Sequence, residues 1–566
     1  MKKTSGARKS PDDSGQRDPG QSSRRDGRWL GLAGLLCLIL ITAVYWLRLD
    51  RVVGMFVDDA WYVLLAKALA TGQGFTLINA PVPHLMPFYP PAFPALLSLV
   101  FRIAPDFPAN LLLLKSVSIA AMIGVTLVTY WYFRYARDLP GYLSLSLAVA
   151  TGLTPPLVFL ATTTVMSEPV FMLWLLLAIS VIEWGVRSTE TRRLWICAFV
   201  GAFFASAAFL TRSIAIALIL SVVIYLLKLR LFKAIAIFAA GVALFVGPWM
   251  IYARLHAPTL EQRRTQNGYI MQDYGTQFWE RKAGDESSGI IRASELPERL
   301  WTNSLQMITR DAGEAVGTKL FYIFQAAGGG EGGISALFAA LAVAGFIAVA
   351  RKRITLAEIT VVLTVIIVVS WPFETFRFVL PLTPFLIYYV IIGLRLIYDL
   401  HLKFLQQPRR EAWVGLTILV GMIAALHLYG HIDYILKKRS PLKTDRPQLI
   451  ASFEENEELL TWIKERLSSE AVIASENPAL INLYTGYKTI ALDNPSGNWA
   501  TWNRLNVRYI ARVNAYRVAN ASLAEIRYKT IYTSKGDLNL RVVDLGPPEI
   551  RRTWGDMRPR EVDFIK

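Results

Sequence analysis

The stretch Trp29–Leu47, WLGLAGLLCLILITAVYWL, contains no charged residue. At about 1.5 Å per residue it is long enough to cross about 30 Å of bilayer hydrocarbon as one helix. A cleavable signal peptide is the alternative, but the run is longer than the usual signal-peptide core and no small-residue cleavage site follows it. We therefore expect an uncleaved first membrane span.

Similar apolar runs recur along the chain and predict about eleven membrane spans. The predicted spans are 29–47, 109–133, 141–160, 169–186, 195–211, 213–227, 234–252, 334–350, 356–373, 378–396 and 412–430. The run Ala92–Ile103 is shorter and follows Tyr89-Pro90-Pro91, which is typical of an interfacial or re-entrant segment. We do not count it as a span.

The composition agrees with a polytopic α-helical membrane protein. Of the 566 residues, 54% are hydrophobic and only 18% are charged, and the mean hydropathy is +0.37. About a quarter of the residues of a soluble protein are charged, so soluble enzymes and disordered scaffolds are excluded. The net charge of +17 lies in short clusters between apolar runs rather than along one face, so no nucleic-acid partner is predicted.

The basic clusters also predict the topology. Residues 1–28 form a basic tail too poor in apolar side chains to fold, and we expect it to be disordered and cytoplasmic. Every second loop then carries Lys or Arg, as cytoplasmic loops should. These residues are Arg134, Arg137, Arg187, Arg192, Arg193, Lys228, Arg230, Lys233, Arg351, Lys352, Arg353, Arg395, Lys403, Arg409 and Arg410. The expected membrane domain is 29–440, in the cytoplasmic membrane, with a first outer loop at 49–108.

After about residue 441 the composition becomes that of a soluble domain. Glu454–Leu467 has the pattern of an amphipathic helix. Short strands are predicted at Ala471–Ser475, Val507–Arg512, Thr530–Tyr532 and Leu538–Leu545, the last two joined by a turn around Lys535-Gly536-Asp537. With eleven spans, this small α/β domain, 441–566, lies on the extracytoplasmic side. We expect it to cover the site and shape the acceptor entrance.

An acidic pair, Asp58 and Asp59, opens a helical run shortly after the first span. Capping and the helix dipole explain one of these carboxylates. The other interpretation is a general base near the boundary between water and lipid. The local pattern leaves both interpretations open.

Two strings in this loop resemble a known family. DDAWYVLLAKALATGQGF at 58–75 and FYPPAFPALLSLVF at 88–101 are similar to the first outer loop of the GT-C superfamily of polyprenyl-phosphate-sugar-dependent glycosyltransferases, most closely protein O-mannosyltransferases and aminoarabinose transferases. The resemblance extends to TVMSEPVF at 164–171, FLTRS at 209–213, GPWMIYARL at 247–255, ETFRFVLPLTPFL at 374–386 and the C-terminal domain. Trp61 stands where aminoarabinose transferases carry a basic residue.

The resemblance implies an inverting transfer of a sugar from a polyprenyl-phosphate donor to an acceptor hydroxyl, on the outer face of the membrane. Asp58 matches the family's catalytic acidic position, and Asp59 and Glu168 complete the expected catalytic set. The reaction itself requires no cofactor, but in related enzymes an acidic residue like Glu168 either helps to hold a divalent metal ion or orients the base, so Asp58 and Glu168 are the candidate ligands of such an ion. The acceptor is a glycolipid, a cell-envelope glycan or a protein, and membrane lipids are the other expected partners.

Two arginines are candidates to bind the donor phosphate, Arg212 first and Arg377 second. A charge inside the bilayer costs at least about 2.5–3.5 kcal/mol, so each needs a partner or a wet surrounding. The alternatives are that Arg212 reaches the interface with its long side chain and that Arg377 pairs with Glu374. Glu168, in Ser167-Glu168-Pro169, equally suits a helix start.

The expected substrate contacts are Tyr62, His84, Tyr89 and Glu374, although lone polar aromatic residues in loops are more often structural. Two other functions remain open: a transporter or flippase for a lipid carrier, and an envelope assembly protein without catalytic activity. A transporter should carry ionisable groups or broken helices near the middle of the membrane. Here the unusual charges gather on one side, which favours the enzyme.

Overall fold

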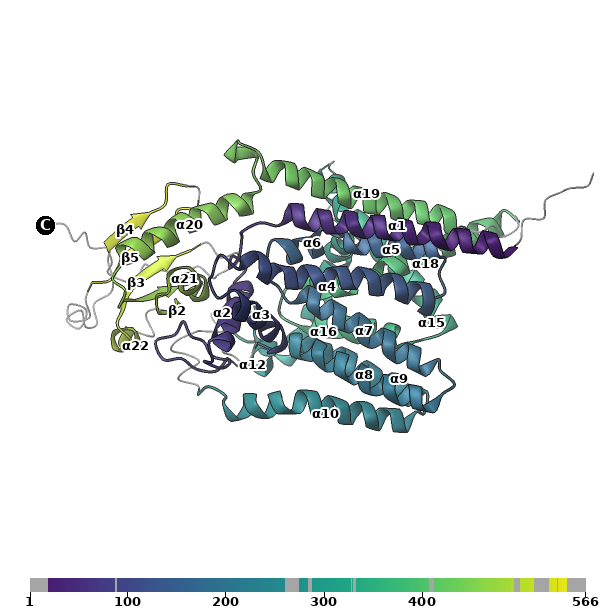
Figure 1. Cartoon of the computed structure of the whole chain (residues 1–566), viewed down its shortest axis with the longest axis horizontal. Coiled ribbons are helices and arrows are strands. Elements are labelled where there is room, and N and C mark those ends of the chain that lie inside the picture. Colours follow the sequence, from purple (N-terminus) through teal and green to yellow (C-terminus); the bar gives the residue numbers. More distant parts are fainter. Residues whose placement is uncertain are drawn as a thin grey trace, which may run out of the picture.

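The computed structural model describes residues 19–86, 89–259, 274–282, 288–326, 328, 332–406, 412–492, 499–513, 529–536 and 538–546, with side chains from residue 29 onward except at 443 and 499–501. Long helices form a bundle, and a small α/β domain lies at one end of it (Figure 1). The predicted architecture, a polytopic helical protein with a small C-terminal α/β domain, is confirmed.

Eight of the described helices are long and apolar enough to cross a membrane. They are α1 (Pro19–Arg48), α4 (Leu111–Trp131, extended by Tyr132–Ala136), α7 (Glu168–Val186), α8 (Thr191–Thr211), α10 (Phe232–Leu255), α15 (Gly333–Lys352), α17 with α18 (Phe376–Val379 and Thr383–Phe404) and α19 (Trp413–Lys438). The pair α5 (Gly141–Gly152) and α6 (Pro155–Thr162), bent by 52°, is a ninth if it forms one span.

Two more predicted spans are shorter helices, α9 (Ile216–Lys228) and α16 (Leu356–Ser370). All eleven predicted spans thus coincide with apolar helices or with the bent pair, and the chain is a multi-pass membrane protein. Helix α1 begins at Pro19, so residues 19–28 of the predicted tail continue the helix, whereas residues 1–18 lie outside the described part of the chain.

The loops predicted to be cytoplasmic meet one another. Arg137 Nη2 lies 3.0 Å from Glu358 Oε1 and donates to Thr355 Oγ1 at 2.8 Å. Lys228 Nζ donates to the Ile354 carbonyl at 3.2 Å. These contacts join three loops that are far apart in the sequence, and they agree with a common side for the basic loops.

Helices α2 (Asp58–Ala70) and α3 (Ala92–Ile103) lie between the bundle and the α/β domain (Figure 1). Helix α3 packs on α2, and its Leu99 and Ile103 side chains are 51% and 82% exposed. A short helix with an apolar outer face is typical of an interfacial segment. The structure thus agrees with leaving 92–103 out of the count of spans. Helices α12 (Tyr274–Trp279), α13 (Leu296–Gln306) and α14 (Ala312–Ala326) belong to the long segment between α10 and α15.

The α/β domain is built on a five-stranded sheet with the order β2-β1-β3-β5-β4. Strands β2, β1 and β3 are parallel, and β5 and β4 continue the sheet in antiparallel pairs. The elements are α20 (Gln448–Arg466), β1 (Val472–Ser475), α21 (Pro478–Thr485), β2 (Thr489–Ala491), α22 (Trp499–Arg504), β3 (Val507–Arg512), β4 (Lys529–Thr533) and β5 (Arg541–Asp544). The four predicted strands correspond to β1, β3, β4 and β5, and part of the predicted turn, Asp537, lies outside the described residues.

This domain is hydrogen-bonded directly to the first outer loop. Thr489 N donates to the Asn79 carbonyl at 2.8 Å, and Lys488 Nζ donates to the Ile78 carbonyl at 2.8 Å. The rings of Tyr484 and Phe107 meet edge to face, with centroids 5.1 Å apart. The domain is therefore held against the loop that carries the acidic pair.

Candidate active site

Asp58 is the first residue of α2. Its side chain is 31% exposed, so a substrate can reach it. The Tyr89 hydroxyl donates to Asp58 Oδ1 at 2.7 Å, and Arg377 Nη1 donates to Oδ2 at 3.0 Å. Tyr89 lies in the Tyr-Pro-Pro turn just before α3, and Arg377 lies at the start of α17. Three separate segments therefore meet at this carboxylate.

Glu168, the first residue of α7, is fully buried and holds two arginines. Its Oε1 accepts from Arg377 Nε at 2.9 Å, with Arg377 Nη2 at 2.8 Å and Arg212 Nη1 at 3.0 Å. Two carboxylates and two guanidinium groups thus balance in charge across the site. A buried carboxylate needs such partners because its desolvation is costly.

Arg212 stands at the break between α8 and α9, where its backbone is extended, with φ −149° and ψ 126°. The break lets the side chain turn toward the site. There Nη1 also donates to Ser167 Oγ at 3.2 Å. The side chain is 12% exposed, against 34% for Arg377. Both arginines therefore line the site, and Arg377 is the more accessible to a ligand.

Asp59 has a different environment from its neighbour. It is fully buried, and its carboxylate accepts hydrogen bonds from the backbone N–H groups of Gly54 at 2.7 Å and of Phe56 and Ala60 at 3.1 Å. Burial raises the pKa of Asp59 to about 6, against the lowering effect of these hydrogen bonds. This geometry favours a structural role in the loop, and a direct catalytic role for Asp59 stays a prediction.

The aromatic rings of Tyr62 and Tyr89 pack against each other beside Asp58. Their rings pack edge to face with centroids 5.2 Å apart, and the Tyr62 ring also packs edge to face on Phe93 at 5.1 Å. The Tyr62 hydroxyl lies 3.1 Å from Ser167 Oγ. Burial raises the pKa of Tyr62, so its phenol stays protonated. Both tyrosines are placed to support the charged groups, with Tyr89 the nearer to a ligand at Asp58.

The two other predicted substrate contacts have other surroundings. The His84 ring is buried, with Nδ1 3.0 Å from the Val82 carbonyl, and burial lowers its pKa. Glu374 is exposed and acts electrostatically on Arg310. Their roles toward a substrate stay predictions. The charge of Arg377 is already balanced by Asp58 and Glu168, so a pairing with Glu374 is not needed to explain it.

The residues present do not fit a metal ion shared by Asp58 and Glu168. The guanidinium of Arg377 lies between the two carboxylates, where such an ion would bind. Within the described ranges, no group of three or more His, Cys, Asp or Glu side chains is arranged to hold a metal ion. The chemistry of the site is therefore derived from its carboxylates, arginines and tyrosines.

Several residues of the site were not predicted. Ser167 joins Tyr62 to Arg212, and its position next to Glu168 was the only available signal. Tyr274 on α12 lies within electrostatic reach of Arg212 and Asp58. Asp311 accepts a hydrogen bond from Thr375 Oγ1, two residues before Arg377. The last two come from a long segment without any recognisable motif.

A buried ion pair holds the start of the first outer loop. Lys115 Nζ on α4 lies 2.9 Å from Asp50 Oδ1 and donates to the Asp50 and Thr163 carbonyls at 2.8 and 2.9 Å. Thr163 Oγ1 donates to Asp50 Oδ2 at 2.9 Å. The chain therefore leaves α1 in a fixed direction before it reaches Asp58.

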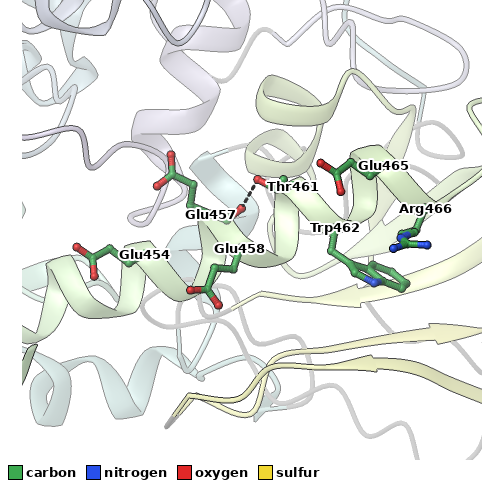
Figure 2. A pocket seen from close by; sticks show the side chains of 7 residues that line it. All are labelled: Glu454, Glu457, Glu458, Thr461, Trp462, Glu465 and Arg466. Atoms are coloured by element: carbon green, nitrogen blue, oxygen red, sulfur yellow. Dashed lines mark hydrogen bonds between the residues drawn. The ribbon is translucent and has the colours of Figure 1, made fainter.

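A separate hollow of about 500 Å³ lies on α20 of the α/β domain (Figure 2). It is lined by Glu454, Glu457, Glu458, Thr461, Trp462, Glu465 and Arg466. All seven side chains come from one helix, and four of them are acidic. Such a face is usual for a solvated helix, so the convergence of several segments at Asp58 remains the stronger candidate site.

No protein-family model matches the chain, and no curated protein matches its sequence. Its structure is similar to ArnT from Cupriavidus metallidurans bound to undecaprenyl phosphate, with a TM-score of 0.52 at 13% identity over 90% of this chain and 98% of that one. For the apo state of ArnT the TM-score is 0.53, at 13% identity over 90% and 97%. The chain therefore shares the overall fold of these ArnT structures, which agrees with the fold that the sequence resemblance implied.

A further similar structure is the Archaeoglobus fulgidus oligosaccharyltransferase, with a TM-score of 0.48 at 12% identity over 84% of this chain and 68% of that one.

Proposed function

We propose that this protein is an inverting membrane glycosyltransferase that moves a sugar from a polyprenyl-phosphate donor to an acceptor hydroxyl. The observation that carries the proposal is the group Asp58, Arg377, Glu168 and Arg212, in which an accessible carboxylate stands beside two arginines at one end of the bundle. The GT-C fold supports the reaction class. The similar ArnT structure that is bound to undecaprenyl phosphate supports a polyprenyl-phosphate carrier.

The roles follow from accessibility and charge. The acceptor oxygen attacks the anomeric carbon, the bond from that carbon to the phosphate oxygen breaks, and the acceptor proton passes to Asp58. The leaving polyprenyl phosphate gains a negative charge, and Arg377 and Arg212 stabilise it. A single displacement inverts the anomeric centre, because no covalent sugar–enzyme intermediate is formed.

Arg377 connects donor binding to the base. Without donor, its Nη1 is paired with Asp58, while Nε and Nη2 stay on the buried Glu168. A donor phosphate competes with the exposed carboxylate for this guanidinium, and Glu168 keeps the guanidinium in place during the exchange. Asp58 Oδ2 is then free to accept a proton.

The test uses purified full-length protein in lipid nanodiscs and a panel of radiolabelled polyprenyl-phosphate sugars, with water as the acceptor and then with mixed envelope lipids and glycans. We expect slow hydrolysis of one donor by the wild type and faster transfer when the right acceptor is present. The Arg377→Ala variant tests whether release of the label depends on the candidate site. Equal label release by wild type, by Arg377→Ala and by empty nanodiscs would contradict the proposal.

The expected location is the cytoplasmic membrane, with the site and the α/β domain on the extracytoplasmic side. Helix α7 runs from Glu168 in the site to Val186, beside the basic loop that starts at Arg187, so this loop lies at the opposite end of the helix, which supports the orientation. Single cysteines placed at exposed positions near each end, labelled in intact cells with an impermeant reagent, test it.

A further inference from the structure

The backbone just before Asp58 is strained. Val57 has φ 64° and ψ −61°, and the Asp58 N–H donates to the Phe56 carbonyl at 2.7 Å. These values describe a γ-turn of the rare, strained type, and a β-branched residue at its centre is a genuine outlier. Such a conformation is energetically unfavourable and persists only where its surroundings hold it. The turn sets the direction in which α2, and with it Asp58, begins.

Asp59 holds this turn from inside the loop. Its Oδ1 accepts from Phe56 N and Ala60 N, on the two sides of Val57, and its Oδ2 accepts from Gly54 N. One carboxylate thus fixes both ends of the strained segment. The bonds reach back to Gly54, whose φ of +86° lies in the region that favours glycine.

The α/β domain holds the same glycine from the other side. Asn477 is fully buried, and its Nδ2 donates to the Gly54 carbonyl at 2.6 Å. Leu480 of α21 packs so closely that a Cβ on Gly54 would lie 2.6 Å from its Cδ1. Gly54 is therefore fixed by Asp59 through its N–H, by Asn477 through its carbonyl and by Leu480 through packing.

Apolar contacts extend this connection. Val52 and Met55 form a buried cluster with Phe453 of α20, and Phe56 and Tyr484 pack against it. The segment from Val52 to Phe56 thus contacts both α20 and α21 of the α/β domain.

We infer that Asn477 is a positioning residue: the α/β domain, through Asn477, Gly54 and Asp59, holds the strained turn at Val57 and so directs Asp58 toward the acceptor. The domain is then part of the catalytic apparatus and more than a cover over it. A small displacement of a catalytic group is enough to lower the rate by about a hundredfold. The inference rests on the proposed function where it concerns turnover, and on the contacts alone where it concerns the loop.

The chain offers a substitution that separates the two roles of Asn477. Its Oδ1 accepts from Leu480 N and caps α21, and an aspartate keeps this cap. The Asn477→Asp variant removes the donor to the Gly54 carbonyl and places a carboxylate oxygen against it, which also adds a negative charge in a buried position. The matched control is Asn482→Asp on the same helix, because Asn482 Nδ2 donates to the Tyr487 carbonyl at 2.7 Å, within the domain.

The first measurement is hydrogen exchange by mass spectrometry on the full-length protein in nanodiscs. We expect Asn477→Asp to raise the exchange rate of peptides covering residues 52–62 by about tenfold or more, while Asn482→Asp leaves it within about twofold. Unchanged exchange in this segment for Asn477→Asp would overturn the inference, whether or not a donor is known.

The second measurement is turnover with the donor that the wild type uses. We expect kcat of Asn477→Asp to fall by about tenfold or more with donor KM within about twofold, because the arginines are untouched. Adding Val57→Gly removes the cost of the positive φ and should restore part of kcat. Wild-type kcat in Asn477→Asp, or no recovery in the double variant, overturns the inference. Failure of the wild type to use any donor would instead count against the proposed function.

Discussion

Asp58 and Arg377 stand 319 positions apart in the chain, and their side chains form an ion pair with 3.0 Å between Oδ2 and Nη1. The same guanidinium binds the buried Glu168 through its other N–H groups. One cation therefore has a fully buried partner on one side and a partly exposed partner on the other. This arrangement suits a group that receives a phosphate without losing its position.

Replacing Arg377 by Lys should not preserve function. A lysine is a point charge and cannot reproduce the forked geometry that joins two carboxylates. We expect Arg377→Lys to lower kcat/KM for the donor by about tenfold or more, with Arg377→Ala at least as low. Steady-state kinetics over a range of donor concentrations measure this. Wild-type kinetics in the lysine variant would show that only the charge matters.

Arg212 should act mainly in donor binding. Its side chain is less exposed than that of Arg377, and Ser167 and Glu168 already hold it. We expect Arg212→Gln to raise the donor KM by about tenfold and to change kcat less, since part of the binding is common to ground and transition states. The control is Arg541→Gln, on an exposed strand position of the α/β domain. A fall in kcat at constant KM would contradict this role.

Glu168 should matter for stability as well as for activity. Removing one member of a buried ion group leaves the other charges without compensation, at a cost of about 3 kcal/mol or more. We expect Glu168→Gln to lower the melting temperature in detergent by several degrees. Glu190→Gln, at an exposed loop position, is the matched control. A melting temperature equal to that of the control would mean that the two arginines do not need this carboxylate.

The burial of Asp59 should make the stability of the folded protein depend on pH. Its pKa of about 6 in the folded protein lies above its ordinary value, so the folded state holds this proton more tightly than the unfolded state. Its contribution to the free energy of unfolding is therefore largest at acidic pH and declines by up to about 3 kcal/mol as the pH rises from about 4 through about 6.

The Asp59→Asn variant lacks this titration and provides the reference. The stability of wild type relative to Asp59→Asn should decrease between about pH 4 and pH 7, as measured by thermal unfolding in a buffer series. Asp433→Asn, a partly exposed carboxylate paired with Lys437, is the control for general charge effects. A relative stability that is constant or increases with pH would contradict the assignment.

Much of the fold was predictable because membrane spans need long apolar runs, which the sequence displays openly. The eleven predicted spans all meet helices or the bent pair, and four predicted strands meet β1, β3, β4 and β5. Strand β2 was missed because Thr489–Ala491 is too short for its pattern to stand out, and the short helices α21 and α22 were also not predicted. The docking of the domain on Gly54 and Asn79 depends on contacts between distant segments, which no local pattern reports.

The site was predictable only in its parts. Asp58, Glu168, Arg212 and Arg377 stood out as charges bordering apolar runs within motifs that resemble GT-C enzymes. The partners of each charge were not predictable, and the local alternative for Arg377, pairing with Glu374, was as reasonable as the observed pairing with Asp58 and Glu168. The different environments of Asp58 and Asp59 arise from the turn at Val57, whose positive φ has no signal in a valine.

The most direct test of the account compares wild type, Asp58→Asn and Asp433→Asn in single turnover with a bound, radiolabelled polyprenyl-phosphate sugar and its acceptor. We expect all three proteins to fold and to bind the donor, and we expect sugar transfer by Asp58→Asn to be slower by about a hundredfold or more, as for the loss of a general base. Transfer by Asp58→Asn at the rate of the other two proteins would contradict the account.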